Sequence, residues 1–422
     1  MRGALLVVLA CGTVLAQPAK KGREPRIGGK TVEGWTKELA KDATALAAVN
    51  ALMKFGPEAR AAAPALAKRL GDDGLVKVFV PIALSRIGPD AVPALKKALE
   101  DKSPAARAGA ATALGLIGAP ARDAGAALIK LLDDKEAAVR RNAATALGQM
   151  GHERARDTLK KLLDDKDAAV AVEAAWALIQ AGDLSGVEVL AKACENEELA
   201  ARAIATLAAL GPKAKDKAGP ALARAAKHKS PEVRYPAAAA LFVVTRTDDG
   251  LAVVEAGLKV AEERKQAVAA LGQFTGSTGA VKVLAESLAH ADAGVRRESA
   301  AALTAHLGGI APARKALEAG LLDADAATRW WCAAALLANP GDVRKIEDDL
   351  LAAFRLGPAP DKAMRAVLDV NGYERLGQAL ARILETRRGR FVVEAALAAG
   401  QAGAEARAAR PALLKVLREG DK

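Results

Sequence analysis

Residues 110–118 read AATALGLIG, and residues 143–151 read AATALGQMG. The same arrangement of an alanine-rich stretch, one leucine and a glycine four residues later returns along most of the chain. Aligned on that leucine, the copies lie 29 to 34 residues apart. A regular period of this length is typical of proteins built from stacked structural repeats. The aligned leucines are Leu52, Leu84, Leu114, Leu147, Leu178, Leu207, Leu241, Leu271, Leu303, Leu336, Leu368 and Leu397.

Each copy reads as two helices joined by an acidic turn. The first helix carries leucines three and four residues apart, as in Leu128, Leu131 and Leu132. The second helix runs through the alanine-rich stretch and ends at a glycine such as Gly118, which suits a left-handed helix C-terminus. Neither helix can bury its apolar side alone, so the pairs must stack. The sequence therefore predicts an all-α solenoid, or superhelix, of about twelve helix pairs.

The composition agrees with thin, closely packed layers of helices. Aromatic residues make up only 3% of the 422 residues, and alanine dominates the apolar half. Small side chains suit helices that touch only their neighbours. The formal net charge is +12, which favours acidic partners. Lysine and arginine are nevertheless spread along the chain among 50 acidic residues, so a soluble protein that is simply basic is the other interpretation.

The repeat itself resembles a known one. The pattern A-A-x-A-L-G-x-[IM]-G, followed by L-x-x-L-L-D-D and then V-R, resembles the HEAT repeat, and more closely the short HEAT-like repeat of phycobilin lyases. Residues 110–118 with 128–140, and 143–151 with 159–170, carry the pattern. The resemblance extends over about residues 31–422 and implies an α-solenoid. Because such solenoids serve many functions, it does not select one.

The chain is expected to have four segments. Residues 1–16 are predicted to be a signal peptide, and residues 17–30, rich in proline, glycine and lysine, a flexible lead-in. The repeats occupy 31–403, with Trp35 covering the open end of the stack. The charged segment 404–422 is expected to form a helix that caps the other end.

The N-terminus predicts export to the periplasm or the exterior. Arg2 precedes an apolar run from Ala4 to Leu15, and small residues stand before a cleavage point after Ala16. The alternative is a lipoprotein signal, Val8-Leu9-Ala10-Cys11, in which Cys11 would carry a lipid. No run reaches the roughly 20 apolar residues that a transmembrane helix needs.

A basic column recurs seven residues before each aligned leucine. Eight of its twelve residues are basic, and seven of those are arginine. We expect these residues to pair with the acidic turns just before them, such as Asp101, Asp134 and Asp292, because a guanidinium group can bridge carboxylates in neighbouring repeats. Ladders of this kind are also implied by the HEAT resemblance; a ligand-binding arginine track is the alternative. The predicted ladder comprises Arg107, Arg140, Arg234, Arg264, Arg296 and Arg329.

The next position along each repeat is a candidate contact surface. The HEAT resemblance implies that the second helix lines the concave side of the solenoid. If this position points outward, aromatic and cationic residues would lie side by side and could bind an acidic partner. The alternative is that the aromatic residues fill gaps between repeats. The candidate patch comprises Tyr235, Lys265, Arg297, Trp330 and Lys362.

The chain offers little for catalysis. Its four histidines fall in different repeats, and neither a nucleophile elbow nor a phosphate-binding loop is present. We therefore predict no catalytic residue, no metal and no cofactor. Cys194 and Cys332, several repeats apart, are expected to be separate buried thiols rather than a disulfide.

These observations favour a non-catalytic scaffold that binds one or more proteins along its concave face. The basic charge leaves a second hypothesis, a protein that binds nucleic acid or another polyanion, such as a HEAT-like DNA glycosylase. The repeat subtype alone suggests a third, a phycobilin lyase. Predicted export argues against both alternatives.

Overall fold

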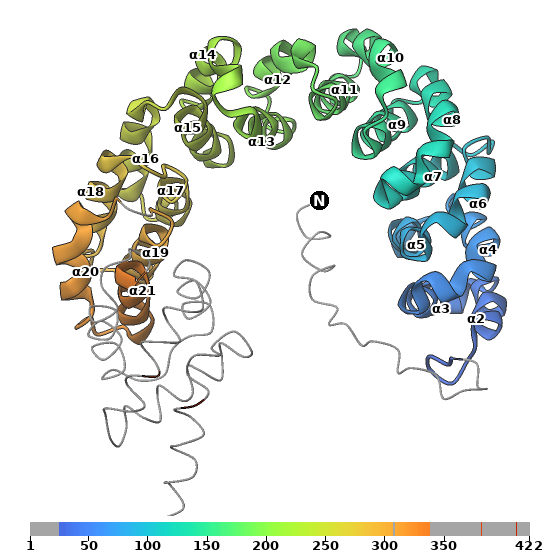
Figure 1. Cartoon of the computed structure of the whole chain (residues 1–422), viewed down its shortest axis with the longest axis horizontal. Coiled ribbons are helices and arrows are strands. Elements are labelled where there is room, and N and C mark those ends of the chain that lie inside the picture. Colours follow the sequence, from blue (N-terminus) through green and yellow to red (C-terminus); the bar gives the residue numbers. More distant parts are fainter. Residues whose placement is uncertain (1–24, 307–308, 338–380, 382–410, 412–422) are drawn as a thin grey trace, which may run out of the picture. The chain divides into compact units, whose positions relative to one another are not determined.

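The computed structural model describes residues 25–306 and 309–337, together with positions 381 and 411 (Figure 1). The chain divides into two compact units, Met1–Ala193 and Cys194–Lys422. The predicted repeats around Leu368 and Leu397 and the predicted capping helix at 404–422 lie outside the described residues. So does the predicted signal peptide.

The first unit consists of short helices in sequence-adjacent pairs. Short 3-10 turns precede many of the first helices; three of these turns, Gly56–Ala62, Gly88–Ala91 and Ala119–Ala124, begin with proline in the first or second position. The α-helices are α2 (Val32–Leu39), α3 (Asp42–Phe55), α4 (Ala63–Ala67), α5 (Gly74–Ile87), α6 (Val92–Ala98), α7 (Pro104–Ile117), α8 (Gly125–Lys130), α9 (Ala137–Met150), α10 (Arg156–Lys161), α11 (Ala168–Gln180) and α12 (Val187–Ala193).

The described part of the second unit continues the same alternation. Its helices are α13 (Ala200–Leu210), α14 (Lys215–Ala225), α15 (Pro231–Thr245), α16 (Leu251–Leu258), α17 (Arg264–Leu271), α18 (Thr278–Ser287), α19 (Ala293–Leu303), α20 (Arg314–Gly320) and α21 (Ala326–Leu337).

The aligned leucines form the core of the stack, as predicted. From Leu52 to Leu336, each lies in the odd-numbered helix of its pair and is at most 3% exposed. In the first unit the odd-numbered helices α3 to α11 lie side by side in one layer, which we call the second-helix layer, and α4 to α10 form another (Figure 1). The all-α solenoid of helix pairs is thus confirmed within the described residues. Among these residues, β-type backbone pairing occurs only as one bridge between Ile27 and Lys30.

Alanine before ten of the twelve aligned leucines and glycine after some of them have a common packing reason. A Cβ atom placed on Gly148 would lie 2.9 Å from the Cα of Ala177, which precedes the aligned leucine of the following repeat. A Cβ on Gly115 would likewise lie 3.0 Å from the Cα of Ala146. The second helices α7, α9 and α11 therefore approach one another closely because both residues at each contact are small.

The helix-ending glycines refine the prediction of a left-handed turn. The six from Gly56 to Gly211 that were predicted and are described all have positive φ. Gly151, with φ 60° and ψ 47°, is in the left-handed helical region. Gly118, with φ 72° and ψ −139°, and the similar Gly56, Gly88 and Gly211 adopt a conformation that is nearly confined to glycine. These glycines reverse the chain from the second helix into the 3-10 turn of the next repeat.

The predicted lead-in ends in ordered structure rather than continuing to residue 30. Ile27 and Lys30 exchange two backbone hydrogen bonds, and the Trp35 indole N–H donates to the carbonyl of Ile27 at 2.7 Å. The Lys30 ammonium lies 4.9 Å from the centre of the Trp35 ring. Trp35 therefore fixes a tight turn of the lead-in at this end of the first unit. Among the described residues, no helix is long and apolar enough to cross a membrane.

Candidate functional site

Bidentate arginine–aspartate pairs connect successive repeats of the first unit. Arg107 at the start of α7 donates to both carboxylate oxygens of Asp134 at 2.8 and 3.0 Å. Arg140 at the start of α9 donates to both oxygens of Asp165 at 2.8 Å. The Arg140 and Asp165 side chains are 8% and 7% exposed, so this pair is almost fully withdrawn from water.

The same arginines also cap the turn of their own repeat. The remaining terminal nitrogen of Arg140 donates to the backbone carbonyls of Asp134 and Lys135 at 2.8 and 3.1 Å. Arg107 binds the carbonyls of Asp101 and Lys102 in the same way. Asp134 thus accepts from Arg107 through its carboxylate and from Arg140 through its carbonyl, so the contacts form a continuous chain.

The predicted direction of pairing was wrong. We expected each arginine to meet the carboxylate of the turn just before it, but Arg107 contacts only backbone carbonyls there. The Asp101 carboxylate instead accepts from the backbone N–H of Ser103. The carboxylate that binds Arg107 comes from the following repeat, because the arginine lies at the side of α7 that faces the next turn.

The ionised state of the aspartates is favoured by these contacts. Hydrogen bonds from Arg140 hold the pKa of the Asp165 carboxyl below its ordinary value, against the opposing effect of burial. Arg296 lowers the pKa of Asp323 in the same way in the second unit. Both pairs therefore remain charged at neutral pH, as bidentate bonding requires.

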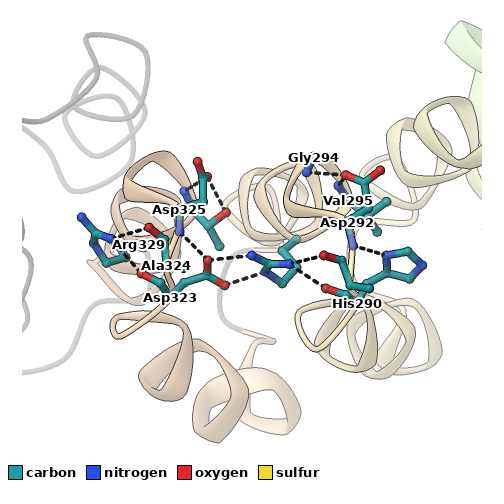
Figure 2. A network of polar contacts seen from close by, with 11 residues as sticks. His290, Asp292, Gly294, Val295, Asp323, Ala324, Asp325 and Arg329 are labelled. Atoms are coloured by element: carbon teal, nitrogen blue, oxygen red, sulfur yellow. Dashed lines mark hydrogen bonds and ion pairs between the residues drawn. The ribbon is translucent and has the colours of Figure 1, made fainter.

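The second unit repeats this geometry around Asp323. Arg296 donates to both oxygens of that carboxylate at 2.6 and 2.9 Å. Arg329 binds the carbonyls of Asp323 and Ala324 at 2.8 and 3.0 Å. Figure 2 shows Asp323 between these two sets of contacts, with His290 and Asp292 in the preceding turn.

Two ladder positions depart from the pattern. Arg234 pairs with Glu263, which also accepts a short hydrogen bond from Tyr235, at a turn where no aspartate takes the usual place. Arg264 donates through Nε to the carbonyl of Leu258. The turn of the following repeat offers His290 instead of an aspartate, so the side-chain ladder is not continued there.

The candidate contact patch is not formed as predicted. Tyr235 and Trp330 are each only 1% exposed, so the expectation that they point outward was wrong. Tyr235 occupies the space left by Gly257 of α16, where a Cβ atom would collide with the phenol. Lys265 is exposed and Arg297 is half-buried. Lys362 lies outside the described residues.

The described residues contain no cluster of three or more histidine, cysteine or acidic side chains able to hold a metal. Cys194 and Cys332 are free and buried, as predicted. Burial raises the pKa of each thiol to about 12, so neither is a nucleophile at neutral pH.

Sequence reasoning missed an exposed apolar surface on the second-helix layer of the first unit. Leu75 and Val78 on α5 are 60% and 46% exposed, and Leu116 on α7 is 49% exposed. The sequence of α5, GLVKVFVPIALSRI, is apolar on every side. A helix with one covered face should carry apolar residues at i, i+3, i+4 and i+7 and polar residues on its other side, so this composition could have revealed the surface.

Comparison with known proteins identifies the repeats. A family model of HEAT repeats matches residues 75–134 and 125–198, which contain the motifs at 110–118 and 143–151. Residues 75–198 therefore carry HEAT repeats. No curated protein matches the sequence.

A solved structure with a TM-score above 0.5 shows the same fold, and two others align less closely. The structure of a Kap95:Nup1 complex aligns with 92% of this chain and 67% of the other, with 13% identity and a TM-score of 0.55. An engineered protein is 23% identical over 90% of this chain and 98% of its own, with a TM-score of 0.41. The CpcE–CpcF complex of phycocyanin lyase from Nostoc sp. PCC7120 is 22% identical over 61% and 97%, with a TM-score of 0.36. At these identities the similarity concerns the α-solenoid alone.

Proposed function

We propose that this protein is an exported, non-catalytic scaffold that binds other proteins along its second-helix layer. The observation that carries the proposal is the exposed apolar surface around Leu75, Val78 and Leu116. A cluster of large apolar side chains on an otherwise polar surface commonly marks a binding site. The protein-bound state of Kap95 in its complex with Nup1, on a similar fold, agrees with this function.

Three of the six ladder arginines contribute to structure rather than to a ligand site. The guanidinium groups of Arg107, Arg140 and Arg296 each make four hydrogen bonds within the protein. A group with five N–H donors has little capacity left for a ligand. The proposal therefore assigns partner binding to the second-helix layer and not to the ladder.

Affinity capture tests the scaffold function directly. Tagged residues 17–422 would be incubated with the envelope fraction of the native host, eluted in steps of increasing salt and examined by mass spectrometry. We expect one or two proteins that survive moderate salt. Recovery of nothing but material shared with an untagged control would contradict the scaffold.

Export is part of the proposal and has its own test. The intact mass of the protein purified from its host should correspond to a chain that begins at Gln17. A chain beginning at a lipid-modified Cys11 would keep export but change the location to a membrane surface. A full-length chain in the cytoplasm would contradict export.

Polyanion binding is a second candidate, favoured by a column of exposed lysines near the ends of the first helices. One such lysine occurs in each repeat from α4 to α12, although acidic residues lie nearby. If the column binds nucleic acid, affinity should fall steeply with salt, in proportion to the phosphates contacted. Binding to a duplex oligonucleotide that is insensitive to substitution of these lysines would contradict it. They are Lys68, Lys97, Lys130, Lys161 and Lys192.

A further inference from the structure

One face of the second-helix layer is apolar over three adjacent helices. Leu75, Val78, Phe79 and Ile82 recur at the spacing that places them on one side of α5. Leu116 extends this apolar face onto α7, and the half-buried Met53 extends it onto α3. Helices α3, α5 and α7 are neighbours in that layer (Figure 1). We refer to these six residues as the apolar face.

From α7 to α11, polar side chains of the same layer form hydrogen bonds between neighbouring helices. Asn142 of α9 donates to the carbonyl of Ala108 at 3.2 Å and to the hydroxyl of Thr112 at 3.1 Å. Thr145 donates to the carboxylate of Glu173 on α11 at 3.0 Å. The polar groups of these side chains therefore find hydrogen-bond partners on the neighbouring helix. The apolar face has no comparable cover from the described residues, since three of its members remain 46–60% exposed.

Unpaired cations lie at one end of the apolar face. Lys54 and Arg86 lie in the last turns of α3 and α5. Both are exposed and form no ion pair with any described residue. The one acid within α3, α5 and α7 is Asp42, and it is bound to Arg69 at 2.8 Å.

We infer that the apolar face binds an amphipathic segment of a partner protein whose apolar residues are flanked by acidic ones. Apolar side chains of the segment would cover Leu75, Val78 and Leu116, and its carboxylates would meet the bordering cations. Helix-in-groove recognition uses such a combination of apolar anchors and charged flanks. A second copy of this chain is disfavoured as the occupant because its identical face would bring two further cations against these. This inference rests on the proposed scaffold function and specifies the chemistry of the partner.

A pair of synthetic peptides tests the inference on residues 17–422. The first, about 15 residues long, carries leucine at i, i+3, i+4 and i+7 with glutamate between them; the second replaces glutamate with lysine. Fluorescence anisotropy should show that the acidic peptide binds at least about 10-fold more tightly than the basic one. Equal affinities would overturn the inferred charge preference.

Three variants locate the binding site. Val78→Asp should weaken binding of the acidic peptide by at least about 10-fold, because it places a charge on the apolar face. The combined variant Lys54→Glu with Arg86→Glu should reverse the preference in favour of the basic peptide. Leu322→Asp, at a residue 83% exposed in the second unit, is the matched control and should bind like the unaltered protein. Unchanged binding by Val78→Asp, with its circular dichroism spectrum preserved, would overturn the inference.

The inference and the proposed function can fail separately. If Val78→Asp captures the same host proteins as the unaltered chain, the scaffold stands and the apolar face is not its docking site. If light scattering shows a dimer that Val78→Asp dissociates, the occupant is a second copy and the inferred partner chemistry is wrong. If the unaltered chain captures nothing, both proposals fail.

Discussion

Replacing Arg140 with alanine is expected to lower the free energy of unfolding by about 3–5 kcal/mol, the usual cost of removing one partner of a buried ion pair. The substitution leaves the Asp165 carboxylate almost fully buried without its two guanidinium hydrogen bonds. It also leaves the carbonyls of Asp134 and Lys135 without their side-chain donor. Urea denaturation of residues 17–422, followed by circular dichroism, would measure the change.

Two control variants separate the ion pair from a general loss of arginine. Arg224→Ala removes a pair with Glu195 whose side chains are 62% and 47% exposed, so it should cost no more than about 1 kcal/mol. The double variant Arg140→Met with Asp165→Leu removes both charges and should be less destabilised than Arg140→Ala. Similar losses for Arg140→Ala and Arg224→Ala would mean that burial does not govern the strength of these pairs.

The pair also predicts how stability depends on pH. Because Arg140 lowers the pKa of Asp165 in the folded state, the unfolded chain binds more protons at acidic pH. The stabilising contribution is complete above the ordinary aspartate pKa of about 4 and is lost as the pH falls towards the folded value. The double variant should therefore lose less stability than the unaltered protein as the pH falls below about 4.

The helix pairs could be predicted because the repeated residues mark contacts between neighbouring repeats. The aligned leucines fill the core, and the alanines before them allow the close approach of the next second helix. A contact that occurs once per repeat leaves a regular trace in the sequence. The period is therefore sufficient to predict the fold from the sequence alone.

The partner of each ladder arginine could not be predicted in the same way. Arg107 has an acidic residue in the turn before it, Asp101, and another in the turn of the next repeat, Asp134. The periodic spacing is consistent with either pairing. Which one forms depends on how far one repeat is displaced from the next, and that displacement is a property of the stack rather than of a single repeat.

The prediction of the contact patch was wrong because helical periodicity does not show which residues of the neighbouring helix surround a side chain. Tyr235 and Lys265 occupy equivalent positions in successive repeats, yet one is buried and the other exposed. Gly257 opens a space on α16 that the tyrosine fills. Gly257 in the first helix of the following repeat is the sequence feature that could have indicated the burial.

The second large effect on stability is expected at the close contact between the second helices α9 and α11. Gly148→Ala is expected to destabilise the protein by about 1–3 kcal/mol, the usual cost of overpacking a core. The added methyl carbon would lie 2.9 Å from both the Cα and the Cβ of Ala177 and 2.6 Å from the ring of Trp176. Because the Cα of Ala177 belongs to the backbone of α11, the clash can be relieved only if α9 and α11 move apart.

Gly272→Ala is the matched control, because Gly272 follows its aligned leucine as Gly148 follows Leu147. There the new methyl carbon would lie 3.4 Å from the Cβ of Ala302, an ordinary contact. Since alanine is favoured over glycine in a helix by up to about 1 kcal/mol, this variant should be neutral or slightly more stable. Thermal unfolding of both variants would distinguish the two positions. Equal stability of Gly148→Ala and Gly272→Ala would mean that α9 and α11 can separate without cost, contrary to a close-packed stack.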